Sequence, residues 1–190
     1  MQRCLQRLAS LNFVAKQRLR FRGYILFECI ADHLHYGDMF KSLNLPDTFY
    51  SWFVITELHI WLLTVRFMAE GENGRIVRNY IVQALWADVE ERTKKLGEIN
   101  RSKIKNEILE LYEQFRAVMV AYDEGLQSSD AVLAGALWRR LYQQESVDLE
   151  HLDMLVKYVR RQVKMLDALT YQELFEQPSI KWEPLNNTPN

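Results

Sequence analysis

The sequence predicts an all-α protein, a single compact multi-helix bundle with an extended C-terminal tail. Apolar residues recur at spacings of three and four along most of the chain, and no useful alternating run predicts a strand. Only seven glycines and four prolines occur in 190 residues, which favours long helices over many turns. Hydrophobic residues make up 48% of the chain, enough to fill the core of one domain.

The first half of the chain predicts three helices. The first covers residues 5–32, and Gly23 marks a point where it can break. A short helix follows at 36–43. The third spans 47–70, because Asp47 or Thr48 can cap its first turn and Gly71 and Gly74 follow its end.

The second half predicts four more helices and a tail. Residues 74–96 form one helix, and Ser102 is expected to cap the next, which ends near Gly125. Ser128 or Ser129 starts a shorter helix through 141, and Asp148 starts the last long one through 166. Prolines favour an extended tail from residue 175. We therefore divide the chain into a basic N-terminal arm or helix (1–23), a helical domain (24–175) and an extended tail (176–190).

The most apolar segment, residues 49–69, has the length of a membrane span. Its ten Leu, Ile, Phe or Val residues contribute about −3 to −6 kcal/mol to insertion. Glu57 and Arg66 each oppose insertion by about 2.5 to 3.5 kcal/mol. The sum does not favour a span. A helix that is apolar nearly all round is normally buried, so we expect the central helix of the bundle, part of which could form a docking surface.

Charge is unevenly distributed along the chain. Residues 1–27 contain six basic side chains and no acidic one, although the whole chain has a net charge of −1. Such a start is typical of organellar targeting, of an arm that binds lipid headgroups or RNA, or simply of a solvated helix. A second basic stripe is predicted at helical spacing of i, i+3, i+4 and i+7. The residues expected to contact an anionic surface are Arg18, Arg20, Arg22, Lys157, Arg160, Arg161 and Lys164.

Acidic residues stand at an unusual place near the end of a predicted helix. Asp123 and Glu124 precede Gly125, where the negative end of the helix dipole disfavours them. Their structural partner could be Arg139 or Arg140 across the turn. The functional interpretation is an acidic hook for another subunit.

Signals for catalysis are weak. The chain has no glycine-rich phosphate loop and no recognisable nucleophile motif. Asp32-x-x-His35 and Asp148-x-x-His151 have the spacing of carboxylate and histidine ligands in di-iron bundles, although Glu is the usual partner there. A helical di-metal or cofactor-binding protein is thus one alternative, and a mitochondrial RNA-binding factor is another. We expect no enzyme activity, no cofactor and no metal. Cys4 and Cys29 are too few for a disulfide scaffold.

Several short motifs, in order and at compatible spacing between about Tyr24 and Pro184, resemble the ubiquinol–cytochrome c chaperone family. They are Leu45-Pro46-Asp47-Thr48-Phe49, Trp52-Phe53, Leu58-His59-Ile60-Trp61, Glu70-Gly71, Trp86-x-Asp88-Val89, Tyr122-Asp123-Glu124-Gly125, Leu137-Trp138-Arg139, Tyr158-Val159-Arg160 and Trp182-x-Pro184.

The resemblance implies a non-enzymatic assembly factor for mitochondrial respiratory complex III. Such a protein would hold newly made cytochrome b together with a small partner assembly factor of the assembly factor 2 type, in a hetero-oligomer. It would lie peripherally on the matrix side of the inner membrane, near lipid and the mitochondrial ribosome. The residues expected to combine fold and partner binding are Trp52, His59, Trp61, Trp86, Asp88, Tyr122, Asp123, Glu124, Trp138 and Arg139.

Overall fold

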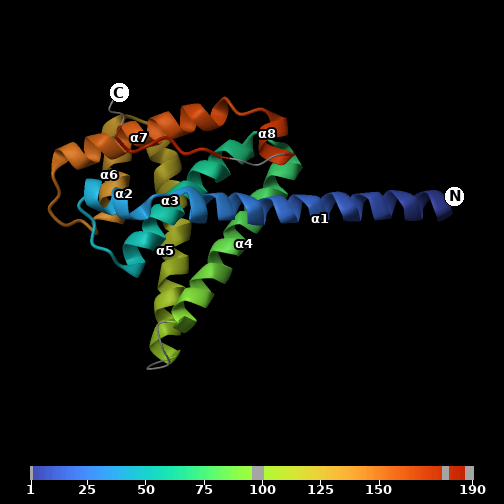
Figure 1. Ribbon diagram of the computed structural model, residues 1–190, viewed down its shortest axis with the longest axis horizontal. Coiled ribbons are helices and arrows are strands. Elements are labelled where there is room, and N and C mark those ends of the chain that lie inside the picture. Colours follow the sequence, from blue (N-terminus) through green and yellow to red (C-terminus); the bar gives the residue numbers. More distant parts are fainter. Residues whose placement is uncertain (1, 96–100, 177–179, 187–190) are drawn as a thin grey trace.

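The structure is a computed structural model that describes the backbone of residues 2–95, 101–176 and 180–186, and the side chains of 13–95, 105–176 and 180–186. Within these ranges the chain forms eight helices and no strand, which confirms the predicted all-α class (Figure 1). The helices are α1 (Gln2–His33), α2 (Tyr36–Ser42), α3 (Phe49–Met68), α4 (Gly71–Lys95), α5 (Arg101–Gln127), α6 (Asp130–Leu141), α7 (Leu149–Asp167) and α8 (Tyr171–Phe175).

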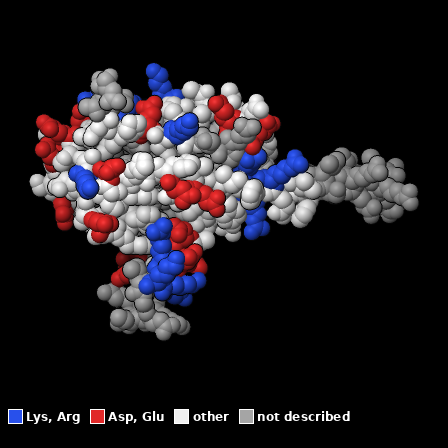
Figure 2. Space-filling model, viewed as in Figure 1, with Lys and Arg blue, Asp and Glu red and all other residues white. Residues whose placement is uncertain are grey.

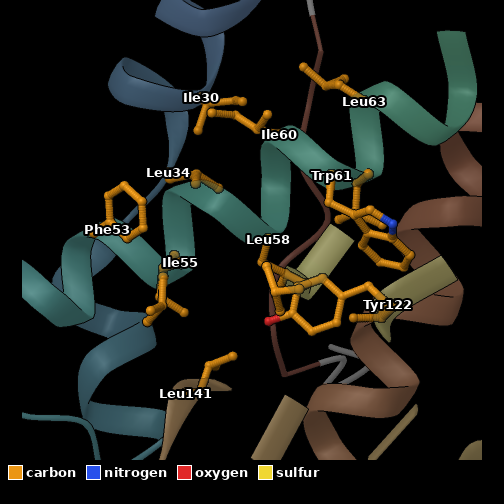
Figure 3. Packing of buried hydrophobic residues seen from close by; sticks show 14 of the residues in the cluster. Ile30, Leu34, Phe53, Ile55, Leu58, Ile60, Trp61, Leu63, Tyr122 and Leu141 are labelled. Atoms are coloured by element: carbon orange, nitrogen blue, oxygen red, sulfur yellow. The ribbon is translucent and has the colours of Figure 1, made fainter. Parts of the chain in front are cut away.

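Helix α3 lies at the centre of the fold. It contacts α1, α2, α4, α5, α6 and α7, and every side chain from Ser51 to Leu63 is buried. Figure 3 shows its apolar residues reaching in several directions, with the rings of Trp61 and Tyr122 next to each other. The segment that has the length of a membrane span is therefore the core of the bundle. Among the described residues, no helix is long and apolar enough to cross a bilayer.

The capping residues at two helix starts were predicted correctly. Thr48 is the N-cap of α3 and accepts a hydrogen bond from the Ser51 amide at 3.2 Å. Asp148 is the N-cap of α7 and accepts one from the Glu150 amide at 3.0 Å. These side chains satisfy amide groups that the first helical turn leaves unpaired.

Other predicted boundaries were wrong. Helix α5 begins at Arg101, so Ser102 lies inside its first turn, and it continues through Gly125 to Gln127. The chain is also still helical at Phe175, because α8 ends there, while residues 180–184 are not helical. Thr170 and Glu173 form a capping box that begins α8 and that the sequence analysis overlooked.

Gly23 does not break α1, which is continuous from Gln2 to His33. Instead it lets α1 and α4 approach closely. A Cβ atom at this position would lie 2.5 Å from the Cβ of Tyr80 and 3.0 Å from the carbonyl oxygen of Val77. The surrounding residues maintain the helical backbone at Gly23, and the missing side chain allows α1 to pack closely against α4.

We predict that Gly23→Ala destabilises the fold by about 1–3 kcal/mol, because the added methyl group must separate α1 from α4. Gly37→Ala is the matched control. Position 37 is an exposed site in α2 with no atom within 4 Å of the added methyl group, so a small stabilisation is expected. Urea unfolding measures both. Equal stabilities of the two variants would contradict the close contact between α1 and α4.

Candidate protein-docking site

Four polar residues of α3 bond to four different helices. Thr56 pairs with Tyr36 of α2, Glu57 with Arg140 of α6, His59 with Tyr158 of α7 and Trp61 with Asp123 of α5. Near the end of α3, Arg66 donates to the backbone oxygens of Leu166 and Leu169. A buried polar group costs free energy unless it is paired, so these contacts favour one arrangement of helices around α3.

Glu57 and Arg140 form a buried bidentate ion pair. The Arg140 Nε and Nη2 atoms donate to the two carboxylate oxygens at 2.6 and 3.0 Å, and Nη1 donates to Gln114 of α5 at 2.6 Å. Burial raises the pKa of Glu57 to about 7, although the hydrogen bonds and charge of Arg140 act in the opposite direction. The pair joins α3, α5 and α6.

His59 is fully buried and neutral. Its Nδ1 atom lies 2.7 Å from the Ile55 carbonyl oxygen, so Nδ1 must carry the proton, and Nε2 accepts the Tyr158 hydroxyl at 2.6 Å. Burial lowers the pKa of His59 to about 4. Trp182 of the tail packs edge-on against the same imidazole at 4.7 Å. The histidine thus connects α3, α7 and the tail.

Asp123 has a structural partner, but not the predicted one. The Trp61 indole N–H donates to its carboxylate at 2.8 Å, while Arg140 is engaged by Glu57. The Arg160 guanidinium donates to the Leu126 and Ser128 carbonyl oxygens and so covers the C-terminal end of α5. A cation placed there offsets the negative potential at the end of α5, which otherwise disfavours the acidic residues.

The ten residues predicted to bind a partner do not form one surface. His59, Trp61 and Tyr122 are enclosed by this chain, so no partner can touch these side chains in this conformation. Glu124 and Arg139 are exposed, and Trp86, Asp88, Asp123 and Trp138 are partly exposed. Partner binding by the ten stays a prediction; the geometry limits direct contact to the accessible ones.

Trp52 is nearly buried but lines the largest of the described cavities, about 520 Å³ in volume. We call this cavity the Trp52 pocket. It lies where α1, α2, α3 and the end of α4 meet. Its lining residues are Ala31, Tyr36, Phe40, Asp47, Thr48, Phe49, Trp52, Arg92 and Lys95.

One wall of the Trp52 pocket is a cation stacked on an aromatic ring. The Arg92 guanidinium carbon lies 4.1 Å from the centre of the Trp52 ring, and Asp88 accepts its Nε–H at 2.9 Å. Asp88 therefore holds Arg92 in place through an ion pair one helical turn apart on α4. Stacking and ion pairing together fix a flat, apolar wall with a charged edge.

Aromatic rings form other walls of the Trp52 pocket, beside the polar side chains of Asp47, Thr48 and Lys95. The rings of Phe49 and Trp52 are 5.3 Å apart, and those of Tyr36 and Phe40 are 6.2 Å apart. Burial raises the pKa of Tyr36 to about 12, and its hydroxyl is 2.8 Å from that of Thr56. The pocket thus combines aromatic rings with the charged side chains of Asp47, Arg92 and Lys95.

The ring of Trp86 on α4 packs against α5. Its ring lies 5.2 Å from that of Tyr112, 5.7 Å from Phe115 and 5.9 Å from Phe53. Its indole N–H is buried without a hydrogen-bond partner among the described residues. Trp138 instead donates to the Glu145 carbonyl oxygen at 2.8 Å, and Arg139 lines a separate groove of about 420 Å³ between α5 and α6.

The predicted basic stripe on α7 is largely engaged within the chain. Arg161 donates to the carbonyl oxygens of Pro184 and Leu185, and Arg160 covers the end of α5. Lys157 pairs with Asp153, and Lys164 is exposed. Contact of the stripe with an anionic surface stays a prediction.

Metal-binding residues do not converge in the part of the chain that the structure describes. No group of three or more His, Cys, Asp or Glu side chains is placed to hold an ion there. His35 and Asp38 line a cavity of about 420 Å³ with Trp182, which joins α2 to the tail. This arrangement lacks the converging carboxylates that a di-metal site requires.

Sequence reasoning missed the importance of Phe49, Tyr36 and Arg92 for the docking site. Phe49 was within a quoted motif, and Arg92 follows Asp88 by one helical turn, so both had a local signal. Their meeting with Tyr36 depends on how α2, α3 and α4 cross, which a single sequence does not reveal.

The fold and the site define an all-helical scaffold with a pocket of aromatic walls and charged edges between α1, α2, α3 and α4. The sequence profile of the ubiquinol–cytochrome c chaperone family matches residues 41–182. The chain is 47% identical over 175 residues to ubiquinol–cytochrome c reductase complex assembly factor 1 of Drosophila melanogaster, covering 90% of this chain and 68% of that protein. It belongs to the ubiquinol–cytochrome c chaperone family.

More distant relatives support this assignment. The human assembly factor 1 is 33% identical over 90% of this chain and 57% of its own length. Protein CBP3, mitochondrial, of Saccharomyces cerevisiae is 34% identical over 77% of this chain and 46% of its own length. No solved structure matches the chain significantly.

The buried His59 predicts a pH-dependent contribution to stability. Its pKa of about 4 lies below the ordinary 6.5, so the unfolded chain binds more protons between these values. The stabilisation of the folded state by neutral His59 is complete above pH 6.5 and is lost as the pH falls through the folded-state pKa. We expect the stability advantage of the wild type over His59→Gln to shrink by about 3 kcal/mol across this interval. A constant difference between the two unfolding curves would show that His59 is not held neutral.

Proposed function

We propose that the protein is a non-enzymatic assembly factor of mitochondrial respiratory complex III that binds newly made cytochrome b together with a small partner assembly factor. The family assignment supports the assembly role. The relatives are named as assembly factors or as a mitochondrial protein, which supports a mitochondrial location for this chain. On this proposal the chain acts by binding and not by catalysis.

The single observation that supports the partner-binding step is the Trp52 pocket. It combines aromatic walls with an Arg92 side chain already held by Asp88 and Trp52. Interfaces concentrate their binding energy in such preformed pockets, which take one bulky anchor residue of the partner. We propose that an aromatic or large aliphatic side chain of the small partner factor occupies it.

A rigid scaffold suits this role. A factor that holds a hydrophobic membrane protein must present a binding surface while its own core stays folded. The polar contacts of α3 supply this rigidity, because they bind α2, α5, α6 and α7 and the segment after α7 at Leu169. Cytochrome b would then contact the assembled pair, with the groove beside Arg139 as the second accessible surface of this chain.

We predict that Phe49→Asp at the Trp52 pocket weakens binding of the purified small partner factor by about thirtyfold, which corresponds to roughly 2 kcal/mol for a lost anchor contact. Calorimetric titration measures the affinity. Recovery of cytochrome b with tagged protein from mitochondria, read by immunoblot, should fall in parallel.

Leu149→Asp is the control for this experiment. Leu149 is 78% exposed on α7, outside the Trp52 pocket, so the same chemical change should leave binding intact. Thermal unfolding of both variants verifies their fold. Wild-type affinity in a folded Phe49→Asp variant would exclude the pocket as the docking site, and absence of both partners from wild-type eluates would contradict the proposed function itself.

A further inference from the structure

Three large apolar side chains are exposed on α1 near the point where the helix leaves the body. Phe13 is 63% exposed, Phe21 64% and Val14 48%. Helical periodicity places them within an arc of about 100°. Leu19 packs against the core and Leu26 is fully buried, and both lie on the opposite side of the helix. We call these three residues the α1 ridge; no described element covers it.

Basic residues border the α1 ridge on both sides. Helical spacing puts Lys16 and Arg20 along one edge and Arg18 and Arg22 along the other. Arg20 leans over the rings of Tyr24 and Tyr80, at 5.9 and 5.4 Å, so it stays beside the body. The first acidic residue of the chain is Glu28, beyond the ridge. An apolar strip with cations along both edges is typical of helices that lie in a membrane interface.

The arrangement of α1 leaves this strip accessible. Figure 1 shows the N-terminal half of α1 extending beyond the other helices, and Figure 2 shows basic side chains where the extension begins. The other cluster of basic side chains, at the end of α4, is neutralised by acids. Arg92 pairs with Asp88 and Lys95 with Glu91. Among the described residues, 13–22 of α1 therefore combine cations with exposed apolar groups and include no acidic residue, although Glu72 of α4 attracts Lys16.

We propose that α1 binds an anionic lipid bilayer as an interfacial helix, with Phe13, Val14 and Phe21 inserted at the headgroup level and the four basic residues contacting lipid phosphates. This inference deepens the proposed function, because it supplies the contact by which the factor reaches a membrane. The ridge favours lipid over RNA. RNA bases can stack on the two phenylalanine rings, but they have no use for the valine, whereas a bilayer takes up all three apolar side chains.

The test is co-sedimentation of the full chain with phosphatidylcholine vesicles, with and without phosphatidylglycerol. We expect binding only when phosphatidylglycerol is present. Each basic residue near an anionic surface contributes about fivefold in affinity, so Arg18→Gln with Arg22→Gln should weaken binding about twentyfold or more. Phe13→Ser with Phe21→Ser should weaken it at least tenfold at unchanged net charge.

Two matched variants control for these changes. Lys41→Gln with Lys181→Gln removes the same charge outside α1 and α7, and Val120→Ser with Leu149→Ser removes exposed apolar groups elsewhere. Both should bind vesicles as the wild type does. The proposal is overturned if this control charge variant loses as much binding as the α1 charge variant, or if the phenylalanine variant binds normally.

An RNA oligonucleotide provides the remaining comparison. The proposal would also be overturned if the chain binds RNA tightly and in a salt-sensitive way but does not bind phosphatidylglycerol vesicles. Vesicle binding does not depend on cytochrome b or on the small partner factor. Failure here would therefore leave the assembly role intact, and failure of partner capture would leave the lipid contact intact.

Discussion

The buried ion pair between Glu57 and Arg140 is the contact on which the arrangement of helices depends most. It places a carboxylate in the middle of the most apolar helix, where a hydrophobic side chain would be buried without a desolvation cost. A buried pair adds little net stability compared with apolar packing, but separating its members is costly. Any packing of α6 that removes Arg140 from Glu57 is therefore disfavoured, and Gln114 extends the same restriction to α5.

The other polar contacts of α3 act in the same way on the remaining elements. His59 selects the position of α7 through Tyr158, and Trp61 selects that of α5 through Asp123. Apolar packing alone permits neighbouring helices to slide or rotate with modest loss, whereas a buried polar group has few alternative partners. The fixed core in turn holds Trp52 and Phe49 at the surface end of α3, where they line the Trp52 pocket together with Arg92.

Local features of the fold were predictable, and long-range ones were not. The caps at Thr48 and Asp148 and the burial of the central helix follow from residue type and periodicity. The partner of Asp123 did not, because Trp61 is 62 residues away and no local signal links them. The motif around Tyr122 did not reveal that Tyr122 is buried while Glu124 is exposed, because a motif shows which residues belong together without showing whether they face water. The Trp52 pocket needs helix crossing angles, which one sequence does not provide.

The most direct test of this account is a double-mutant cycle on Glu57→Leu and Arg140→Met, measured by chemical unfolding. Each single change leaves a buried polar group without its partner, so each should cost about 3–5 kcal/mol. The double variant should cost far less than the sum, with a coupling free energy above roughly 2 kcal/mol. Additive effects, within about 0.5 kcal/mol, would contradict the claim that this pair fixes α6 against α3.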